Sequence, residues 1–593
     1  MSRFFNFILA LVMALALVPA PAAAQSANYR IAGTVVDAFT GQPLPLAEVT
    51  LSPVSALNEA QTFLTASDGR FLFTNLAPGK YRLLAVRRGY TLQGFNAHEG
   101  YMTAIVAGPG QDSAHLRFRL SPSAVLTGTI SDQWNDPVRE AEVLLFHQSW
   151  SGGSFALHFS EKTGTDDLGR YRFSHLSPGT YAVAVVARPW WESVVSQSIV
   201  VSKSGAQTGA SGPANLIESL GSSTIAADTG VPAISNPALD VVYPVTYFPN
   251  VTSLAEAARL TLRPGAMETA DVTLRPVPSL HLHVKVPAAA TTQSSSPTDV
   301  SDDETTDAPV TDSGPRVDLS LEIGGYGSNQ IPTTTTEISP GLFELSGIPP
   351  GDISVMLIDS QGGSTSIRMR SLHLSASTEL DLNSHGPLAD VSGVVLMESD
   401  AANETVFGRS KFSSPVLTLR SSNTGESYTT SVSAKGEFSF AGSAIPSGIY
   451  EVGFGPYSPV QVMSLEAIGA TVSRHTVDLS SSSPIRLTVH AAQASCTITG
   501  FALKEGKPIA GAMILLVPQD PDQNAAFFHR DQSDSDGSFT MAPIFPGRYT
   551  LLAIENGWEL EWANPAVLFK YLPNGQPIEL LRGAALNLNA KVQ

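Results

Sequence analysis

The sequence predicts an all-β protein built from about five antiparallel β-sandwich domains in tandem. Three observations lead to this fold class. A short cassette of residues recurs five times along the 593 residues. The segments around its copies alternate apolar and polar residues with the period of two that indicates strands, and helical periodicity is almost absent. Self-similarity along a whole chain is typical of repeated structural units, and here the unit is made of strands.

Each cassette contains a turn at a glycine, an alternating strand, a second turn with proline and glycine, and a returning strand. The first copy reads Asp68-Gly69-Arg70-Phe71-Leu72-Phe73 and then Leu76-Ala77-Pro78-Gly79-Lys80-Tyr81. Glycine permits positive φ at both turns, and proline fixes φ in the second. Phe71 and Phe73 share one face of their strand, which we expect to be the core face, and we expect the cassette to be a hairpin of two strands. The glycine pairs of the five copies are 69/79, 169/179, 341/351, 436/448 and 537/547, ten residues apart except in the fourth copy.

An N-terminal targeting segment precedes the repeats. Arg3 is followed by an apolar run, residues 7–18, and by Ala22-Ala23-Ala24 before Gln25. This is the three-part pattern of a secretory signal peptide, so we expect residues 1–24 to be removed on export. A retained membrane anchor is the alternative, but the apolar run is short for a helix that spans a bilayer. No later stretch approaches about 18 uninterrupted apolar residues, so we expect no transmembrane span in the mature chain.

The cassettes divide the rest of the chain into five predicted domains, which are residues 25–121, 122–278, 279–386, 387–493 and 494–593. The second domain contains a Ser/Gly/Ala-rich loop at residues 202–237. The third contains a polar insert, residues 288–314, which has too few apolar residues to offset its ordering entropy and is expected to be disordered.

The elements follow a common order within each domain: an opening strand, a turn, a second strand and then the cassette. In the first domain residues 31–36 form the opening strand, residues 47–51 the second, and residues 114–120 a closing strand. The opening strands of the other four domains are predicted at residues 126–130, 280–284, 391–395 and 498–502. Their second strands, where we assign one, are predicted at residues 141–145, 416–419 and 513–517.

Composition excludes some classes of function. The net charge of −18 opposes binding to nucleic acid, which requires a basic surface. The single cysteine, Cys496, excludes disulfides within the chain, so each domain depends on its own apolar core. Cys496 itself lies in a predicted strand and is expected to be a small buried apolar residue.

The cassettes and opening strands resemble the carboxypeptidase regulatory-like family, a prealbumin-like β-sandwich that is also described as a carbohydrate-binding-like fold. The family's opening G-x-V corresponds to Gly33-Thr34-Val35, its second strand to residues 43–49, and its glycine–aromatic segment with P-G-x-Y to residues 65–81. The match is specific in the first, second and fifth domains, partial in the fourth and weak in the third. The resemblance implies a non-catalytic accessory domain, found beside the catalytic domain of secreted carboxypeptidases and as tandem modules in bacterial surface proteins. It supplies no catalytic residue.

Motifs of enzymes and metal sites are missing from the sequence. It has no His-Glu-x-x-His, no Gly-x-Ser-x-Gly and no Cys-x-x-Cys. The closest approach to a metal motif is His281-Leu282-His283, whose histidines share one face of a strand, as residues of an exposed polar face also do. The acidic residues 301–307 lack the ligand spacing and turn glycine of a calcium loop. We therefore predict no enzymatic activity, no cofactor and no metal site.

The aromatic residues are the better indication of a binding surface. Trp190 and Trp191 are adjacent, and neighbours on a strand point to opposite faces, so they cannot both be core. One of them could form a platform for sugar stacking, and Tyr243 and Tyr247 raise the same question. The alternative is that these rings are covered by the 202–237 loop or by a neighbouring domain.

The sequence thus predicts a non-catalytic protein that is secreted or held in the bacterial cell envelope, whether periplasmic, cell-surface or extracellular. Its expected role is surface interaction or scaffolding, with an envelope protein or a glycan as partner. The alternative is a carbohydrate-binding module protein that assists polysaccharide capture through Trp190, Trp191, Tyr243 and Tyr247. A hydrolase without a recognised motif is a third hypothesis.

Overall fold

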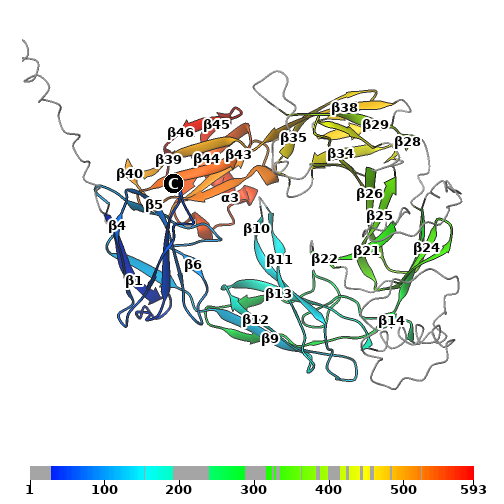
Figure 1. The fold of residues 1–593 in the computed structure, drawn as a ribbon, viewed down its shortest axis with the longest axis horizontal. Helices are drawn as coiled ribbons and strands as arrows, with labels where there is room; N and C mark the ends of the chain where they lie inside the picture. The colour runs from blue at the N-terminus through cyan, green and yellow to red at the C-terminus, as the bar shows by residue number, and fades with distance from the viewer. Residues whose placement is uncertain are drawn as a thin grey trace, which may run out of the picture.

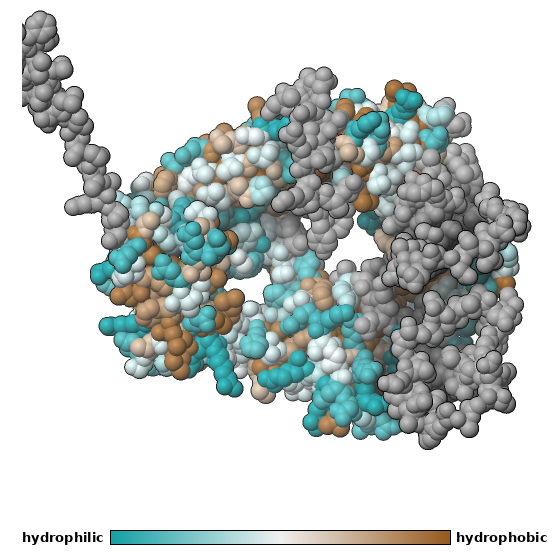
Figure 2. Space-filling model, viewed as in Figure 1, coloured by the Kyte–Doolittle hydropathy of each residue, from teal (hydrophilic) through white to brown (hydrophobic). Residues whose placement is uncertain are grey.

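The computed structural model is a ring of β-sandwich domains (Figure 1). The first domain lies beside the fifth, so that the chain closes on itself, and the space-filling view shows an opening between the domains (Figure 2). The predicted all-β fold is confirmed. The structure describes residues 29–111, 113–151, 154–190, 239–286, 316–323, 326–328, 334–361, 364–381, 388–397, 415–422, 426–440, 445–454, 458, 460–473, 475–480, 484–521 and 524–593. The predicted signal peptide, the 202–237 loop, the 288–314 insert and the acidic residues 301–307 lie outside these ranges.

The first domain shows the plan that the other domains repeat. Two sheets, ordered β4-β1-β8 and β3-β2-β5-β6 with β7 also paired to β5, enclose a core that contains residues of this domain alone. The opening strand β1 is antiparallel to β4 and parallel to β8. The strands are β1 (Tyr29–Asp37), β2 (Glu48–Pro53), β3 (Gln61–Leu64), β4 (Arg70–Leu76), β5 (Gly79–Val86), β6 (Gln93–Gly94), β7 (Ile105–Ala107) and β8 (Leu116–Leu120).

The cassette is not a hairpin, and that expectation is wrong. Its first strand pairs with the opening strand in one sheet, whereas its second strand pairs with β2 in the facing sheet. Phe71 and Phe73 on one side and Tyr81 on the other therefore bury against the same core from opposite sheets. The proline-glycine turn crosses the end of the sandwich, and the Tyr81 hydroxyl donates to the Ala77 carbonyl at 2.8 Å across this turn. The pairing is the same in all five copies.

The second domain follows the same plan with an extended hairpin. Its sheets are ordered β12-β9-β17 and β11-β10-β13-β15, with β18 added beside β9 and β16 beside β13. The strands are β9 (Ala124–Ser131), β10 (Glu142–Ser151), β11 (Ser154–Gly164), β12 (Arg170–Leu176), β13 (Gly179–Val186), β14 (Val241–Val242), β15 (Thr246–Tyr247), β16 (Leu260–Leu262), β17 (Met267–Thr269), β18 (Val272–Thr273) and β19 (Val277–Pro278).

Second and third domains share a hydrophobic core. Strand β13 is buried on both faces: Val183 and Val185 face the core of the second domain, whereas Ala182 and Ala184 pack into a core that extends through the third. The strands of the third domain are β20 (Leu280–Lys285), β21 (Arg316–Ile323), β22 (Tyr326–Ser328), β23 (Thr334–Ser339), β24 (Leu342–Ile348), β25 (Gly351–Gln361), β26 (Ser364–Leu374) and β27 (Thr378–Asp381).

Third and fourth domains share a sheet. Strand β26 pairs with β31, which joins the two domains in one sheet of nine strands ordered β22-β21-β25-β26-β31-β30-β34-β37-β36. The strands of the fourth domain are β28 (Leu388–Ala389), β29 (Val391–Met397), β30 (Val416–Ser421), β31 (Ser427–Ser431), β32 (Glu437–Ser439), β33 (Ile445–Pro446), β34 (Ile449–Phe454), β35 (Val460–Ile468), β36 (Thr471–Ser473), β37 (Thr476–Asp478) and β38 (Ile485–Gln493).

The fifth domain adds a helical layer. One face of β41 lies in the core of the sandwich, and the other packs against Trp562 and Leu568 of the segment that carries helix α3. Cys496 is buried, as expected. The elements are β39 (Cys496–Lys504), β40 (Lys507–Pro508), β41 (Met513–Pro518), η4 (Ala525–Phe527), β42 (His529–Gln532), β43 (Ser538–Ile544), β44 (Gly547–Ile554), η5 (Gly557–Glu559), α3 (Pro565–Tyr571), η6 (Leu572–Asn574), β45 (Gln576–Leu580), β46 (Ala585–Asn587) and β47 (Ala590–Lys591).

A glycine in the opening strand allows the last strands of a domain to approach it closely. In four domains a Cβ at this glycine would lie within 2.2 Å of a carbonyl oxygen of the neighbouring chain, far inside van der Waals contact. The third domain has Val284 at the position that pairs with the first cassette aromatic. This departure agrees with its weak sequence match. The four glycines are Gly33, Gly128, Gly393 and Gly500.

Candidate functional site

The ring closes where a segment of the fifth domain, residues 530–535, meets a loop of the first domain, residues 94–107. We call these two segments the closing contact. Backbone and side chain both take part: the Ser535 nitrogen donates to the Ala104 carbonyl at 3.0 Å, and the Val106 nitrogen donates to the Ser535 hydroxyl at 2.8 Å. The Ala104 nitrogen donates to the Asp534 carboxylate at 2.9 Å. These contacts join positions more than 400 residues apart in the chain.

Gln532 is the central polar side chain of the closing contact. It is 1% exposed, and its amide nitrogen donates to the Asn96 carbonyl and to the Thr103 hydroxyl, both at 2.7 Å. Its amide oxygen lies 3.0 Å from Nδ1 of His98. With the amide oxygen as acceptor, His98 carries a proton on Nδ1. The side chain is thus fully used by the first domain, as burial of a polar group requires.

Two ion pairs cross the closing contact with opposite polarity. Lys80 Nζ lies 2.6 Å from the Asp534 carboxylate, and the Arg530 guanidinium lies 2.5 Å from the Glu99 carboxylate. Burial raises the pKa of Asp534, and the hydrogen bond from Lys80 opposes that rise without cancelling it. Burial also raises the pKa of the neighbouring Asp531 to about 6, against hydrogen bonds from the Thr540 and Gln532 nitrogens.

Aromatic rings surround Arg530. Its guanidinium lies 4.3 Å from the ring centre of Trp562, 5.1 Å from Tyr101 and 5.8 Å from Trp558. The His98 ring stacks on Trp558 with centroids 5.5 Å apart and planes within 9°. A cation over such rings is attracted by their negative faces, so the guanidinium links the aromatic residues of the first and fifth domains.

The second domain reaches the same place through its long hairpin. Strands β10 and β11 pair over their whole length, but β13 accompanies β10 only as far as His147, so the remainder extends beyond the sheet as an arm (Figure 1). Near the tip, Trp150 packs on Phe155 at 4.8 Å and on Trp562 of the fifth domain at 4.9 Å. Nearer the base, Phe159 stacks on Tyr326 of the third domain at 4.2 Å.

The first, second and fifth domains meet at one junction around Trp562. This ring contacts Trp150 of the arm and the Arg530 guanidinium, which in turn contacts Tyr101 and Glu99 of the first domain. Burial lowers the pKa of His147 on the arm, with an opposing electrostatic contribution from Glu99. The chemistry of the junction is that of an interface, with stacked rings, paired charges and satisfied amides.

The aromatic residues predicted as a ligand platform occupy different environments. Tyr243 is 3% exposed in the core of the second domain, and Tyr247 is 5% exposed in the core shared with the third. Burial raises the pKa of both hydroxyls to about 12. Trp190 is 65% exposed after β13, and Trp191 lies outside the described residues. Of the three described residues, Trp190 is the one with an exposed ring.

The paired histidines lie at the boundary of the second and third domains. His281 is placed between two carboxylates, with Nε2 2.9 Å from Asp240 and Nδ1 3.0 Å from Glu344, and His283 lies 3.6 Å from Glu344. Burial alone would lower the pKa of His281, but the two carboxylates outweigh it and raise that pKa. Among the described residues no group of three or more His, Cys, Asp or Glu has an arrangement that could hold a metal ion.

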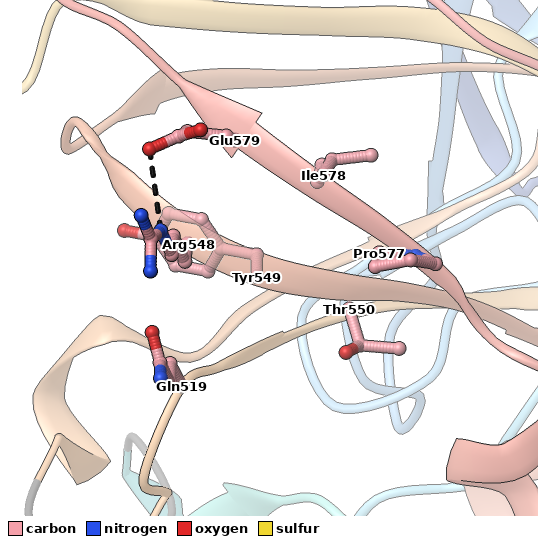
Figure 3. A pocket seen from close by; sticks show the side chains of 7 residues that line it. All are labelled: Gln519, Arg548, Tyr549, Thr550, Pro577, Ile578 and Glu579. Atoms are coloured by element: carbon pink, nitrogen blue, oxygen red, sulfur yellow. Dashed lines mark hydrogen bonds and ion pairs between the residues drawn. The ribbon is translucent and has the colours of Figure 1, made fainter.

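One shallow pocket, of about 410 Å³, lies on the fifth domain beside β44 and β45 (Figure 3). Arg548 and Glu579 face each other at its rim, 3.2 Å apart, and both are largely exposed to solvent. Such a pair is strongly hydrated and offers no buried group for catalysis. The lining residues are Gln519, Arg548, Tyr549, Thr550, Pro577, Ile578 and Glu579.

The first domain, which contributes the loop that closes the ring, is similar to one known family. Residues 30–121 match the carboxypeptidase regulatory-like domain family. No curated protein matches the chain. The match places the surface that closes the ring, residues 94–107, within the regulatory-like domain.

Solved structures similar to this chain include one Bacillus anthracis protein and two streptococcal pilins, all at low sequence identity. The TIE protein of Bacillus anthracis is 10% identical over all of this chain and 79% of its own, with a TM-score of 0.14. A streptococcal ancillary pilin is 10% identical over 60% of this chain and 98% of its own, with a TM-score of 0.19. The minor pilin GBS52 of Streptococcus agalactiae is 12% identical over 44% of this chain and all of its own, also at 0.19.

Sequence reasoning missed the junction. The tryptophans at 150, 558 and 562 are visible as aromatics, but nothing local links them to Tyr101 of the regulatory-like domain. Helix α3 begins at a recognisable helix-start signal in the sequence. Asn564 caps the helix by accepting a hydrogen bond from the Ala566 nitrogen, and Pro565 occupies the first helical position. No helix in the described part of the chain is long and apolar enough to cross a membrane.

Proposed function

We propose that this protein is an exported, non-catalytic scaffold of the cell envelope that presents its ring of β-sandwiches to an envelope protein. The observation that carries the proposal is the junction of the first, second and fifth domains, which holds repeated accessory domains in one closed arrangement. A closed ring fixes the relative positions of several surfaces, as a scaffold requires. The regulatory-like match of the first domain and the signal-like N-terminus support the same role.

Export is tested by expression of the chain with its own N-terminus. We expect the protein in the periplasm, at the cell surface or in the medium, with a mature form that begins at Gln25. Envelope binding is tested with the purified mature chain and isolated envelopes, where saturable binding competed by unlabelled protein is expected. Protease treatment of the envelopes should abolish it. Absence of saturable binding would contradict the scaffold role.

A second candidate, glycan binding, rests on the exposure of Trp190. Packing of a sugar ring on an exposed indole is a common way to bind a glycan, because the indole presents a flat apolar face. Binding on a glycan array that is lost in Trp190→Ala would favour this candidate. Trp134→Ala is the matched control, because Trp134 is also an exposed tryptophan of the second domain.

A further inference from the structure

The domains of the ring are not joined with equal strength. The second and third share one hydrophobic core, and the third and fourth share one hydrogen-bonded sheet. The first domain has a core of its own residues only. Its contact with the fifth consists of hydrogen bonds, ion pairs and the packing of His98 and Tyr101 on Trp558, and the described residues form no hydrophobic core that spans the two domains. Polar contacts between domains resemble transient interfaces and permit relative motion, so the first domain is the part most easily released.

Both sides of the closing contact are formed independently of each other. In the first domain, the backbones of His98 and Tyr101 exchange two hydrogen bonds, which fix the loop. In the fifth domain, Arg530 packs on Trp562 and Trp558, which belong to the same domain. Separation would place Lys80, Glu99 and the Gln532 amide in water and would break the contacts of Trp558 with His98 and Tyr101, while each segment keeps the contacts made within its own domain.

The connection between the first and second domains is short and belongs mainly to the first. The Thr91 nitrogen donates to the Ser121 carbonyl, and the Ser123 nitrogen donates to the Gly89 carbonyl. Toward the second domain, the Gly265 nitrogen donates to the Pro122 carbonyl at 3.1 Å. A rotation at this connection breaks the Gly265 to Pro122 hydrogen bond and leaves the strands of both sandwiches paired.

We propose that the first domain is a latch that closes the ring by docking residues 94–107 on residues 530–535, and that it swings away as a rigid body about residues 121–123. The second domain keeps its hold on the fifth through Trp150 and Trp562 when the latch opens. Opening uncovers the two segments of the closing contact. The inference that opening of the latch controls which surface the scaffold presents rests on the proposed function. The movement of the first domain does not rest on it.

Pulsed electron-electron spin resonance on the full mature chain tests the latch. Spin labels are attached at Thr62→Cys in the first domain and Lys570→Cys in the fifth, both exposed positions, after Cys496→Ala removes the buried native thiol. The parent chain should show one dominant short distance. Lys80→Met combined with Glu99→Gln should raise the population of a longer distance about 5- to 30-fold, because two partly exposed ion pairs are removed.

A matched control removes a lysine charge elsewhere. Lys504→Met breaks an ion pair with Glu555 that lies wholly within the fifth domain, and it should leave the distance unchanged. Hydrogen exchange in β5 should stay slow in every variant, which shows that the first domain moves without unfolding. The latch is overturned by one unchanged distance in the double variant, or by fast exchange in β5 when the long distance appears. Failure of envelope binding with two distances present would contradict the scaffold role and leave the latch intact.

Discussion

At the scale of single residues, two positions recur in four of the five domains, a tyrosine in the cassette and a glycine in the opening strand. The tyrosine two residues after the second cassette glycine donates its hydroxyl to the carbonyl four residues before it in four domains. This hydrogen bond braces the turn where the chain crosses from one sheet to the other, and a tyrosine corner serves β-sandwiches in a similar way. The third domain lacks this tyrosine, as it lacks the opening-strand glycine. The four bonds are Tyr81 to Ala77, Tyr181 to Ser177, Tyr450 to Pro446 and Tyr549 to Phe545.

The opening-strand glycine of the fourth domain should not tolerate a side chain. A Cβ at Gly393 would lie 1.9 Å from the Leu487 carbonyl oxygen and 2.8 Å from the Phe438 ring. Gly393→Ala should destabilise the fourth domain by about 1–3 kcal/mol through overpacking, measured by chemical denaturation. Gly453→Ala in the same domain meets no atom within 4 Å and should change stability by about 0.5 kcal/mol or less. Equal effects of the two substitutions would contradict the close approach of β38.

His281 should make stability depend on pH. Its pKa is raised above the ordinary value near 6.5, because Asp240 and Glu344 favour the imidazolium more than burial opposes it. A raised pKa gives a contribution to stability that is complete below about pH 6.5 and is lost as pH rises through the folded value. The melting temperature of the parent chain should therefore exceed that of His281→Asn by more at pH 6 than at pH 9. A difference that is constant across this range would show that the contact is not charged.

At the scale of elements, the β10–β11 arm connects domains that are distant in the chain. Its base contacts the third domain through Phe159 and Tyr326, and its tip contacts the fifth through Trp150 and Trp562. A two-stranded ribbon is marginally stable alone, so the extended part of the arm depends on these aromatic contacts. The arm thus acts as a strut across the ring.

A double-mutant cycle should measure the contact at the arm tip. Trp150→Ala and Trp562→Phe, singly and together, should give a coupling energy of about 0.5–1.5 kcal/mol, the range for paired aromatic rings. Trp134→Ala replaces Trp150→Ala in a control cycle, because this exposed tryptophan lies in a turn of the second domain, and its coupling to Trp562 should be near zero. A coupling energy near zero in the first cycle would mean that the contact between Trp150 and Trp562 does not stabilise the protein.

The sequence is sufficient to predict where the strands lie, but it does not predict which strands pair with one another. Alternation placed Phe71 and Phe73 on the core face correctly, because the period of two depends only on which side of the strand is buried. The cassette was misread as a hairpin because a short turn between two strands fits both a hairpin and a crossing between sheets. The closing contact was beyond prediction, since Gln532 and Asn96 each look like ordinary polar residues of a strand end and a loop. Their pairing is a property of the assembled ring.

At the scale of the whole molecule, the shared core and the shared sheet should make the middle of the ring one cooperative unit. Leu419 is fully buried in the fourth domain, whose sheet continues through β26 into the third. Leu419→Ala should cost about 2–5 kcal/mol and should also speed hydrogen exchange in β25 of the third domain. Leu83→Ala removes an equally buried leucine from the first domain and should leave exchange in β25 unchanged. Independent behaviour of β25 in both variants would show that the joined sheet transmits no stability.

The closing contact also has a consequence for the order in which the molecule is made. The first domain can fold as soon as its own strands have emerged, because its core needs no other part of the chain. Asp534, the partner of Lys80, is synthesised 454 residues later. At about 5–20 residues per second this delay is roughly 20–90 s. A first domain that folds within that time leaves its docking loop exposed until residues 530–535 follow, so that a chaperone or a neighbouring chain can reach a surface that the finished ring covers.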